Sequence, residues 1–191
     1  MIFLGVDMER KRILAWEMWG ILFIALAGSL LHFTFELSGG WRPMAVISAV
    51  NESVWEHLKI GFWPALVWAV IEFFAFGRRS RNFIFAKGIS LLTIPVVIVG
   101  LFYGYTWIFK TDSLIIDILI FIISIVVAQI ISYRINILQK RRLSGNMIGA
   151  VLIIAGIISF SLMSYYPPKC PLFRDGVTGG YGIIGHQHQD K

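Results

Sequence analysis

Long apolar stretches alternate with short polar segments along the whole chain. A helix that crosses the roughly 30 Å hydrocarbon core of a bilayer needs about 20 mainly apolar residues, because backbone groups left unpaired in lipid cost several kcal/mol each. Five stretches reach this length, each bounded by charge, glycine or proline: 13–37, 54–76, 83–109, 113–138 and 147–165. The pattern predicts an all-α membrane protein with a five-transmembrane-helix bundle over residues 1–166.

The composition supports the membrane class and excludes several others. Of the 191 residues, 57% are hydrophobic and only 15% are charged, and the mean hydropathy of +0.75 is too high for a soluble globule of this size. The net charge of +6 comes from short basic clusters between apolar stretches, so it does not indicate nucleic-acid binding. Cys170 is the only cysteine, which excludes an internal disulfide and a cysteine-based zinc knuckle.

The distribution of lysine and arginine predicts the orientation in the membrane. Ten of these residues fall on one side of the predicted helices: Arg10, Lys11, Arg12, Arg78, Arg79, Arg81, Lys87, Lys140, Arg141 and Arg142. The loops on the other side hold three: Arg42, Lys59 and Lys110. By the positive-inside rule the N-terminus is cytoplasmic and the C-terminus extracytoplasmic. The first apolar stretch is too long for a signal peptide, so we expect a retained helix in a multi-pass protein of the plasma or inner membrane.

Ionisable side chains gather where the first predicted helix ends and the second begins. His32 and Glu36 are spaced i and i+4, so they share one face of a helix near its outer end. After a short semi-apolar loop a second group follows: Asn51, Glu52, Glu56 and His57. The sequence therefore predicts a polar site at the extracytoplasmic face, built from two imidazoles and three carboxylates.

Two chemical interpretations of this site are open. Nitrogen and oxygen ligands favour a divalent metal, above all zinc but also manganese or iron, and four residues are the main candidates to hold it: His32, Glu36, Glu56 and His57. A carboxylate beside an imidazole also suits general acid–base chemistry, with Glu52 and Glu56 as the candidate catalytic groups. Three further residues are expected to support the site: Asn51, Glu52 and Asp117, the last from the fourth predicted helix.

A structural interpretation of the same residues is equally open. Ser53 and Glu56 fit the capping box S-x-x-E, in which each side chain satisfies a free backbone N–H of the other at a helix start. The acidic groups would then pair with Lys59 and Arg42. In that case the residues hold the loop together and bind no ligand.

Other polar side chains lie inside the predicted helices. Glu17 and Glu72 fall near cytoplasmic helix ends, where we expect them to pair with Arg12, Arg78 or Arg79. Three residues of the fourth helix are expected to hydrogen-bond to neighbouring helices: Ser124, Gln129 and Ser132.

The chain changes character after residue 166. Residues 167–191 alternate short apolar pieces with a glycine-rich turn, which predicts an irregular or hairpin-like tail. Because Phe173, Tyr181 and Ile183 are residues of buried type, we expect the tail to fold over the outer helix ends as a lid on the polar site. The expected lid residues are Phe173, Asp175 and Tyr181. The terminal HQHQDK is expected to be a frayed polar end, and the role of Cys170 stays open.

Three sequence motifs resemble those of an uncharacterised family of small prokaryotic multi-pass membrane proteins, known as a domain of unknown function. They are HFTFELSG (32–39), NESVWEHLK (51–59) and PPKCPLFRDGVTGGYG (167–182). The resemblance covers the whole chain and brings no activity with it. It implies that the two His/Glu segments and the tail belong to one feature, although Asp175-Gly176 stands where the family tends to have Asp-Pro.

Two classes of function are therefore expected. The first is an enzyme or metal-binding protein that acts on a lipid or another amphiphile from the outer leaflet. The second is a non-enzymatic membrane component, either a small permease or an accessory subunit, which forms a homo-oligomer or joins a partner in a membrane complex. Small residues that permit close helix approach favour the second: Gly28, Gly100, Gly104, Gly149 and Gly156. Whether the chain is an enzyme stays undecided at this point.

Overall fold

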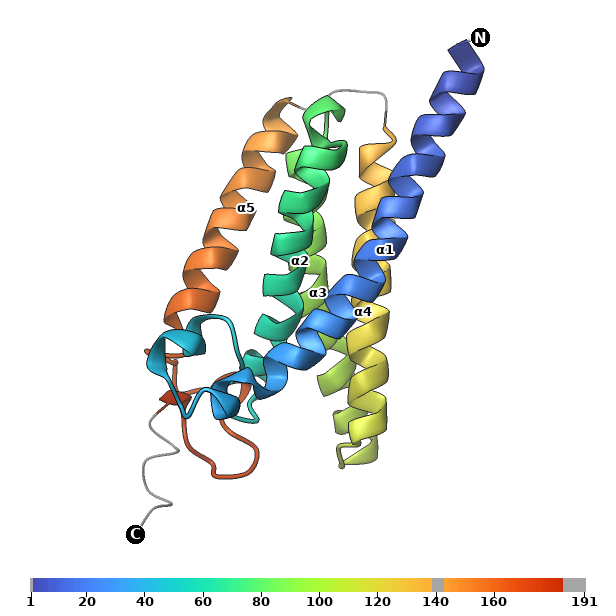
Figure 1. The fold of residues 1–191 in the computed structure, drawn as a ribbon. Coiled ribbons are helices and arrows are strands. Elements are labelled where there is room, and N and C mark those ends of the chain that lie inside the picture. The colour runs from blue at the N-terminus through green and yellow to red at the C-terminus, as the bar shows by residue number, and fades with distance from the viewer. Residues whose placement is uncertain (1, 139–142, 184–191) are drawn as a thin grey trace.

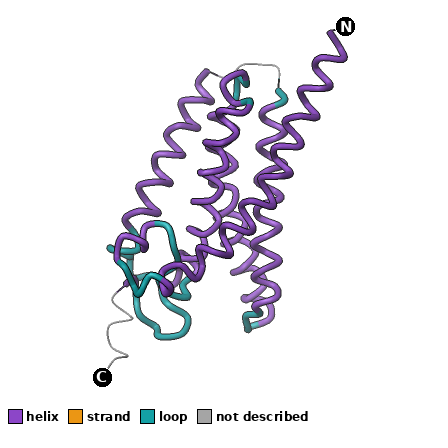
Figure 2. The backbone as a smooth tube through the Cα atoms, viewed as in Figure 1, coloured by secondary structure: helices purple, strands orange, loops and turns teal. Residues whose placement is uncertain are grey.

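The computed structural model describes residues 2–138 and 143–183, which fold into five long α-helices (Figure 1). They are α1 (Ile2–Leu37), α2 (Val54–Ala75), α3 (Phe83–Phe109), α4 (Leu114–Asn136) and α5 (Leu143–Leu162). Three short 3-10 helices accompany them: η1 (Arg42–Val46), η2 (Gly77–Arg79) and η3 (Pro171–Phe173). Within the described residues there is no β-strand (Figure 2). The prediction of an all-α fold with five long helices is confirmed.

The five helices are long and apolar enough to cross a membrane. Their outward faces expose large apolar side chains, for example Leu26, Leu30, Val96, Ile118 and Val151. Soluble proteins rarely expose an apolar surface of this extent, whereas helices that contact lipid tails require one. The structure therefore agrees with a multi-pass membrane protein.

The start of α1 differs from the prediction. The hydrophobic pattern places the first helix at 13–37, but α1 begins at Ile2. Hydrophobicity marks only the part of a helix that lies in the hydrocarbon, while Glu9, Arg10, Lys11 and Arg12 are good helix formers that continue it into water. The other four helices begin and end within four residues of the predicted positions.

The bundle has two chemically different ends (Figure 1). α3 packs against α2, α4 and α5, and α1 crosses obliquely over α2 and α4. The start of α1 lies at the same end as η2, and we call this the basic end because of its arginines: Arg10, Arg12, Arg78, Arg79 and Arg81. The opposite end, called the site end, holds residues 38–53 and 163–183 side by side.

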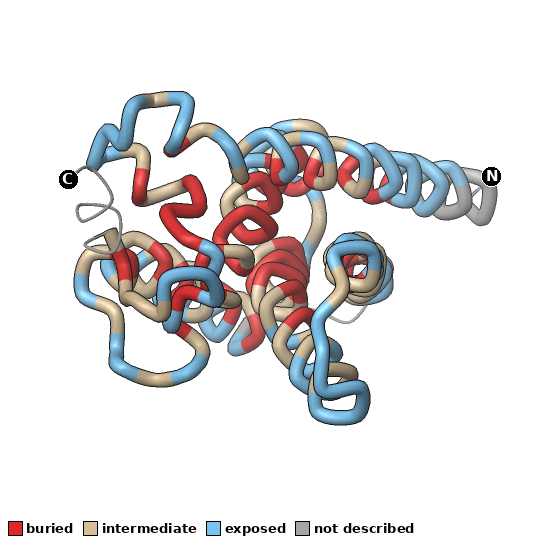
Figure 3. Tube along the Cα trace, turned by 90° about the horizontal axis from the view of Figure 1, so that it is seen from below, coloured by how far each residue is buried: buried red, intermediate tan, exposed pale blue. Residues whose placement is uncertain are grey.

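The core lies where the inner faces of the helices meet. In Figure 3 the buried positions lie on the sides of the helices that face one another. Each helix contributes a buried residue to its centre: Ile24, Phe62, Leu91, Ile125 and Phe160. Between membrane helices these side chains stabilise the fold through close van der Waals packing, because lipid tails are as apolar as they are. The five helices therefore form one packed unit, which holds the two ends in a defined relation.

Glycines permit close contacts between some helices but not at every position. A Cβ atom on Gly88 of α3 would lie 2.5 Å from backbone atoms of Gly149 in α5, so these two backbones touch. Two further glycines are equally close to other residues of the bundle: Gly28 and Gly156. By contrast, a Cβ on Gly100 or Gly104 would meet nothing within 4 Å. These two glycines lie on an open face of α3.

Candidate functional site

Ser48 fastens the segment between α1 and α2 to the end of α1. Its hydroxyl donates to the carbonyl oxygen of Leu31 at 2.5 Å and accepts from the Thr34 hydroxyl and the Phe35 N–H, both at 2.9 Å. Ser48 is fully buried. Because the bonded residues flank His32 on α1, this contact holds the start of α2 next to that histidine.

The start of α2 is built around an N-cap. α2 begins at Val54, and the hydroxyl of Ser53 accepts a hydrogen bond from the Glu56 N–H at 3.4 Å. In a complete capping box Glu56 would bond back to the Ser53 N–H, but the side-chain oxygen of Asn51 accepts from that group at 2.9 Å. The Glu56 carboxylate is therefore available for other partners, and Glu52 lies before the helix starts.

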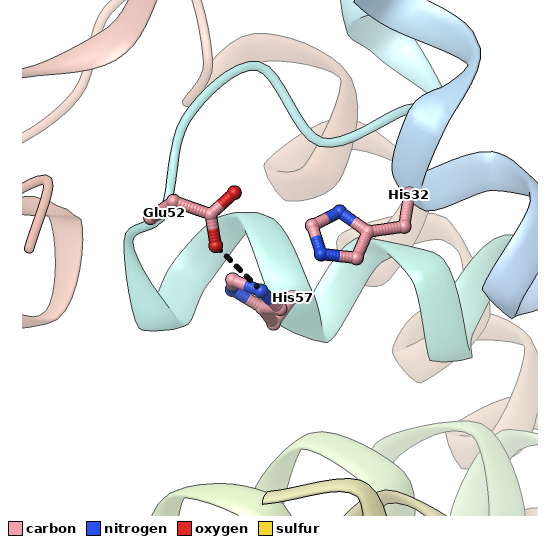
Figure 4. Close-up of side chains that lie close together, drawn as sticks. All are labelled: His32, Glu52 and His57. Atoms are coloured by element: carbon pink, nitrogen blue, oxygen red, sulfur yellow. Dashed lines mark ion pairs between the residues drawn. The ribbon is translucent and has the colours of Figure 1, made fainter. Parts of the chain in front are cut away.

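Three side chains meet at the site end: His32 from α1, and Glu52 and His57 from the start of α2 (Figure 4). One ligand atom of each lies within 4.8 Å of the other two. Glu52 Oε2 is 3.3 Å from His57 Nε2, and the two imidazole centroids are 5.0 Å apart in a T-shaped arrangement. Figure 4 shows the imidazole of His32 facing both other residues. We call these three residues the His-Glu-His group.

Hydrogen bonds determine where His57 carries a hydrogen and how the pKa of Glu52 is shifted. Nδ1 of His57 lies 2.8 Å from the carbonyl oxygen of Ser53, which can only accept, so Nδ1 carries a hydrogen. The hydrogen bond between the His57 imidazole and Glu52 lowers the pKa of the Glu52 carboxyl group below its usual range, although partial burial opposes this shift. The side chains of His57 and Glu52 are 34% and 51% exposed, so water reaches the group.

Four residues named for the site from the sequence lie outside the His-Glu-His group: Glu36, Asn51, Glu56 and Asp117. Glu36 is exposed close to the end of α1. Asp117 accepts a hydrogen bond from the Tyr105 hydroxyl at 2.6 Å, which links the start of α4 to α3. The structure thus gives Asp117 a local partner of its own.

Glu56 belongs to a separate buried network at the site end. Its carboxylate forms an ion pair with Lys59 at 2.5 Å, accepts from the Ser164 hydroxyl at 2.7 Å and accepts from the Val50 N–H at 3.2 Å. Lys59 also donates to Ser164 at 2.6 Å and to the carbonyl of Ala45 at 2.7 Å. The network joins α2, the end of α5 and the η1 segment. Pairing with Lys59 is the structural role that the sequence allowed for Glu56, whereas Ser164, more than 100 residues away, gave no signal.

The prediction that Glu17 and Glu72 pair with arginines is wrong. Both carboxylates pair with Lys87 of α3, which is buried between them. Arg12 instead donates to the carbonyl oxygen of Ala75 at 2.6 Å. Guanidinium groups at the basic end remain near water, whereas Lys87 faces the bundle interior.

The polar residues of α4 follow the prediction at two of three positions. Ser132 donates to Glu17 of α1 at 2.6 Å, and Gln129 donates to the backbone carbonyl of Glu17 at 3.1 Å. The Ser124 hydroxyl donates to Phe121 within its own helix at 2.7 Å, so this prediction is wrong. A buried serine inside a helix can satisfy its hydroxyl with the backbone of its own helix.

The tail packs against the start of α2. Trp55 stacks between Phe160 of α5 and Phe173 of the tail, with ring centroids 4.7 and 4.6 Å apart. Asn51 donates to the carbonyl of Gly182 at 3.2 Å. In place of two strands the tail contains η3 and one isolated antiparallel bridge: Arg174 and Tyr181. The terminal HQHQDK lies outside the described residues.

Asp175 organises the turn of the tail. Its carboxylate accepts from the Thr178 hydroxyl, from the backbone N–H groups of Val177, Thr178 and Glu52, and is itself largely buried. Burial alone would raise the pKa of the Asp175 carboxyl group, but these hydrogen bonds outweigh it and lower the pKa below the ordinary value of 3.8. Asp175 therefore ties the tail directly to the backbone of a member of the His-Glu-His group.

We expect the tail to detach at acidic pH. A carboxyl group with a lowered pKa stabilises the folded state above its unfolded pKa, and this contribution is lost as the pH falls through the folded value, below 3.8. Proteolysis at residues 170–183 should therefore be slow at neutral pH and fast below the lowered pKa of Asp175. Asp175→Asn should make cleavage fast at both pH values. Equal cleavage of the wild type at both pH values would contradict this role.

Comparison with known proteins places the chain in a family without assigning an activity. No curated protein and no solved structure matches it. Residues 7–183, which contain the His-Glu-His group and the described part of the tail, match a family of unknown function, DUF6512, and the chain belongs to that family.

Proposed function

We propose that this chain is a membrane protein that binds one zinc ion through His32, Glu52 and His57. The observation that carries the proposal is the convergence of one ligand atom from each residue within 4.8 Å of the others. Two imidazole nitrogens and one carboxylate oxygen are the protein ligands of many catalytic zinc sites, which keep a fourth position for water or substrate.

The spacing of two ligand atoms supports zinc. Zinc lies about 2.0–2.1 Å from an imidazole nitrogen and about 2.0–2.2 Å from a carboxylate oxygen, so two ligands in a tetrahedron are about 3.3–3.5 Å apart. The distance between His57 Nε2 and Glu52 Oε2 is 3.3 Å. These two atoms therefore need almost no movement to share one ion.

The hydrogen bond on the far side of His57 supports the same role. A metal-binding histidine usually donates its other ring N–H to a carbonyl or carboxylate, which orients the ring and fixes its tautomer. Nδ1 of His57 makes such a contact with the Ser53 carbonyl oxygen at 2.8 Å. When a metal displaces the hydrogen that Nε2 shares with Glu52, the lone pair of Nε2 is directed towards Glu52 and His32, where the ion would lie.

The position of the group indicates what such a site would do. By the positive-inside rule the basic end is cytoplasmic, so the His-Glu-His group faces the extracytoplasmic side. Exposed apolar side chains surround it on α1, including Leu30, Phe33 and Leu37. Zinc would activate a water molecule for hydrolysis there, and an amphiphile of the outer leaflet is the substrate class that reaches the group.

Zinc titration of the purified full-length protein tests the proposal. After treatment with a chelator, calorimetry should show one zinc ion bound per chain. His32→Ala and His57→Ala should abolish this binding, and Glu52→Gln should weaken it by at least about 10- to 100-fold, the loss that even outer-shell changes cause. All proteins should carry His186→Ala and His188→Ala, so that any adventitious chelation by these alternating histidines of the sequence does not enter the titration.

Glu36→Gln is the matched control, since Glu36 lies one turn beyond His32 on the same helix and is exposed. It should leave zinc binding unchanged. Absence of stoichiometric zinc uptake by the wild type would overturn the proposal, and so would an equal loss in Glu36→Gln.

A second candidate, a non-enzymatic component of a membrane complex or homo-oligomer, is favoured by one observation. Gly100 and Gly104 form a G-x-x-x-G pair, and a Cβ atom built on either glycine would meet nothing within 4 Å. A discrete oligomer or a stoichiometric partner that is lost on Gly100→Leu would support it. A monomer that copurifies with nothing would count against it.

A further inference from the structure

A second cluster of ionisable groups lies inside the bundle, towards the basic end and separate from the His-Glu-His group. Glu17 of α1, Glu72 of α2 and Lys87 of α3 are 2%, 0% and 3% exposed. Lys87 Nζ is 2.9 and 3.0 Å from the two carboxylate oxygens of Glu17, and it also contacts Glu72 Oε2. One ammonium group thus lies between two carboxyl groups.

The two carboxyl groups have different surroundings. Oε1 of Glu17 accepts from the Ser132 hydroxyl at 2.6 Å and from the Asn136 amide at 3.4 Å, in addition to Lys87. Glu72 forms an ion pair with Lys87, but within the described residues neither of its oxygens receives a hydrogen bond of good geometry. Glu17 is therefore the better stabilised carboxylate.

Counting charges shows that the cluster is not neutral when both acids are ionised. α4 contributes only neutral groups: Gln129, Ser132 and Asn136. Arg134 of α4 and Arg78 of η2 are exposed, and Arg78 stacks over Phe74 rather than facing Glu72. Two carboxylates and one ammonium leave a net charge of −1, and an uncompensated charge buried among apolar side chains is strongly unfavourable.

A polar connection joins the cluster to water at the basic end. A cavity of about 360 Å³ there is lined by Glu9, Arg10, Arg79 and Asn136, among others. Asn136 lies at its inner wall, and its side-chain amide donates both to Glu17 and to Ser132, each at 3.4 Å. Asn136 therefore belongs both to the lining of the cavity and to the hydrogen-bond partners of Glu17.

We propose that Glu17, Glu72 and Lys87 form a proton-binding site that holds one proton on the carboxyl group of Glu72. The proton exchanges with the solution at the basic end through the cavity next to Asn136. The proton is assigned to Glu72 because Glu17 accepts hydrogen bonds from the larger number of donors. The ligand is the proton itself, and the site works independently of any metal at the other end of the bundle.

Infrared difference spectroscopy of the full-length protein in liposomes tests the proposal. The wild type should show the C=O stretch of a buried protonated carboxyl group, which shifts in D₂O and disappears as the pH is raised. Glu72→Gln should remove this band. Glu17→Gln should remove it as well, because Glu72 then forms a neutral pair with Lys87 and ionises. Glu36→Gln, which changes an exposed glutamate, should leave the band intact.

Lys87→Met is expected to strengthen the band, whereas the two glutamine variants are expected to remove it. A gain in intensity cannot be explained by a variant that fails to fold. Without the ammonium group both acids should be protonated, so the intensity of the band should about double. Asn136→Leu should keep the band but slow its isotope shift. A wild type without the band, a band unaffected by Glu72→Gln, or a band that does not shift in D₂O would each overturn the proposal. Zinc binding should be unchanged in all these variants.

Discussion

Lys59→Met is expected to lower the free energy of unfolding by about 3–5 kcal/mol, the usual cost of removing one partner of a buried ion pair. Lys59 is fully buried, and its ammonium group pairs with Glu56 and donates to Ala45 and Ser164. The substitution leaves the Glu56 carboxylate buried without its cation. The same change should loosen the start of α2, which carries His57.

Unfolding midpoints in detergent, followed by tryptophan fluorescence or thermal aggregation, measure this effect. Lys169→Met removes an exposed lysine of the tail and should change stability by less than about 0.5 kcal/mol. The double variant Glu56→Gln with Lys59→Met should be more stable than Lys59→Met alone, because no uncompensated charge remains. Equal midpoints for Lys59→Met and Lys169→Met would show that the network contributes nothing to stability.

Gly88→Ala is expected to destabilise the bundle by about 1–3 kcal/mol or more, through overpacking between α3 and α5. The added methyl group would lie 2.5 Å from the backbone of Gly149, and backbone cannot move aside as a side chain can. Gly149→Ala should act in the same way, because its methyl group would lie 2.3 Å from the carbonyl oxygen of Ile84.

Gly100→Ala is the matched control on the same helix. Its methyl group would meet nothing within 4 Å, so the better helix propensity of alanine should leave stability unchanged or raise it by about 0.5–1 kcal/mol. Thermal midpoints of Gly88→Ala and Gly100→Ala at equal detergent concentration provide the comparison. A loss for Gly100→Ala as large as that for Gly88→Ala would indicate that α3 makes a further contact through its open face.

The helices could be predicted from the sequence because lipid imposes a length of apolar residues that is visible in one dimension. The start of α1 at Ile2 could not, because the charged residues 9–12 interrupt the hydrophobic pattern although they are good helix formers. The direction in which Lys87 points could not be predicted either. It depends on the rotation of α3 in the bundle, which sequence spacing within one helix does not reveal.

The candidate site was predictable in part for the same kind of reason. His32 and His57 lie on helices joined by a short segment, so their approach follows from connectivity. The choice between Glu52 and Glu56 does not, because helical i, i+4 spacing applies only after Val54, where α2 begins. Glu52 precedes that point and pairs with His57. Glu56 instead accepts a hydrogen bond from Ser164, which lies more than 100 residues away in the sequence.

The shared lysine between α1, α2 and α3 has a consequence for biosynthesis. Chains are made from the N-terminus, so the first two membrane helices leave the ribosome before Lys87 does. Until the third helix inserts, Glu17 and Glu72 have no cation inside the bilayer and resist burial there. We therefore expect the first two helices to insert stably only after the third has left the ribosome and supplied Lys87.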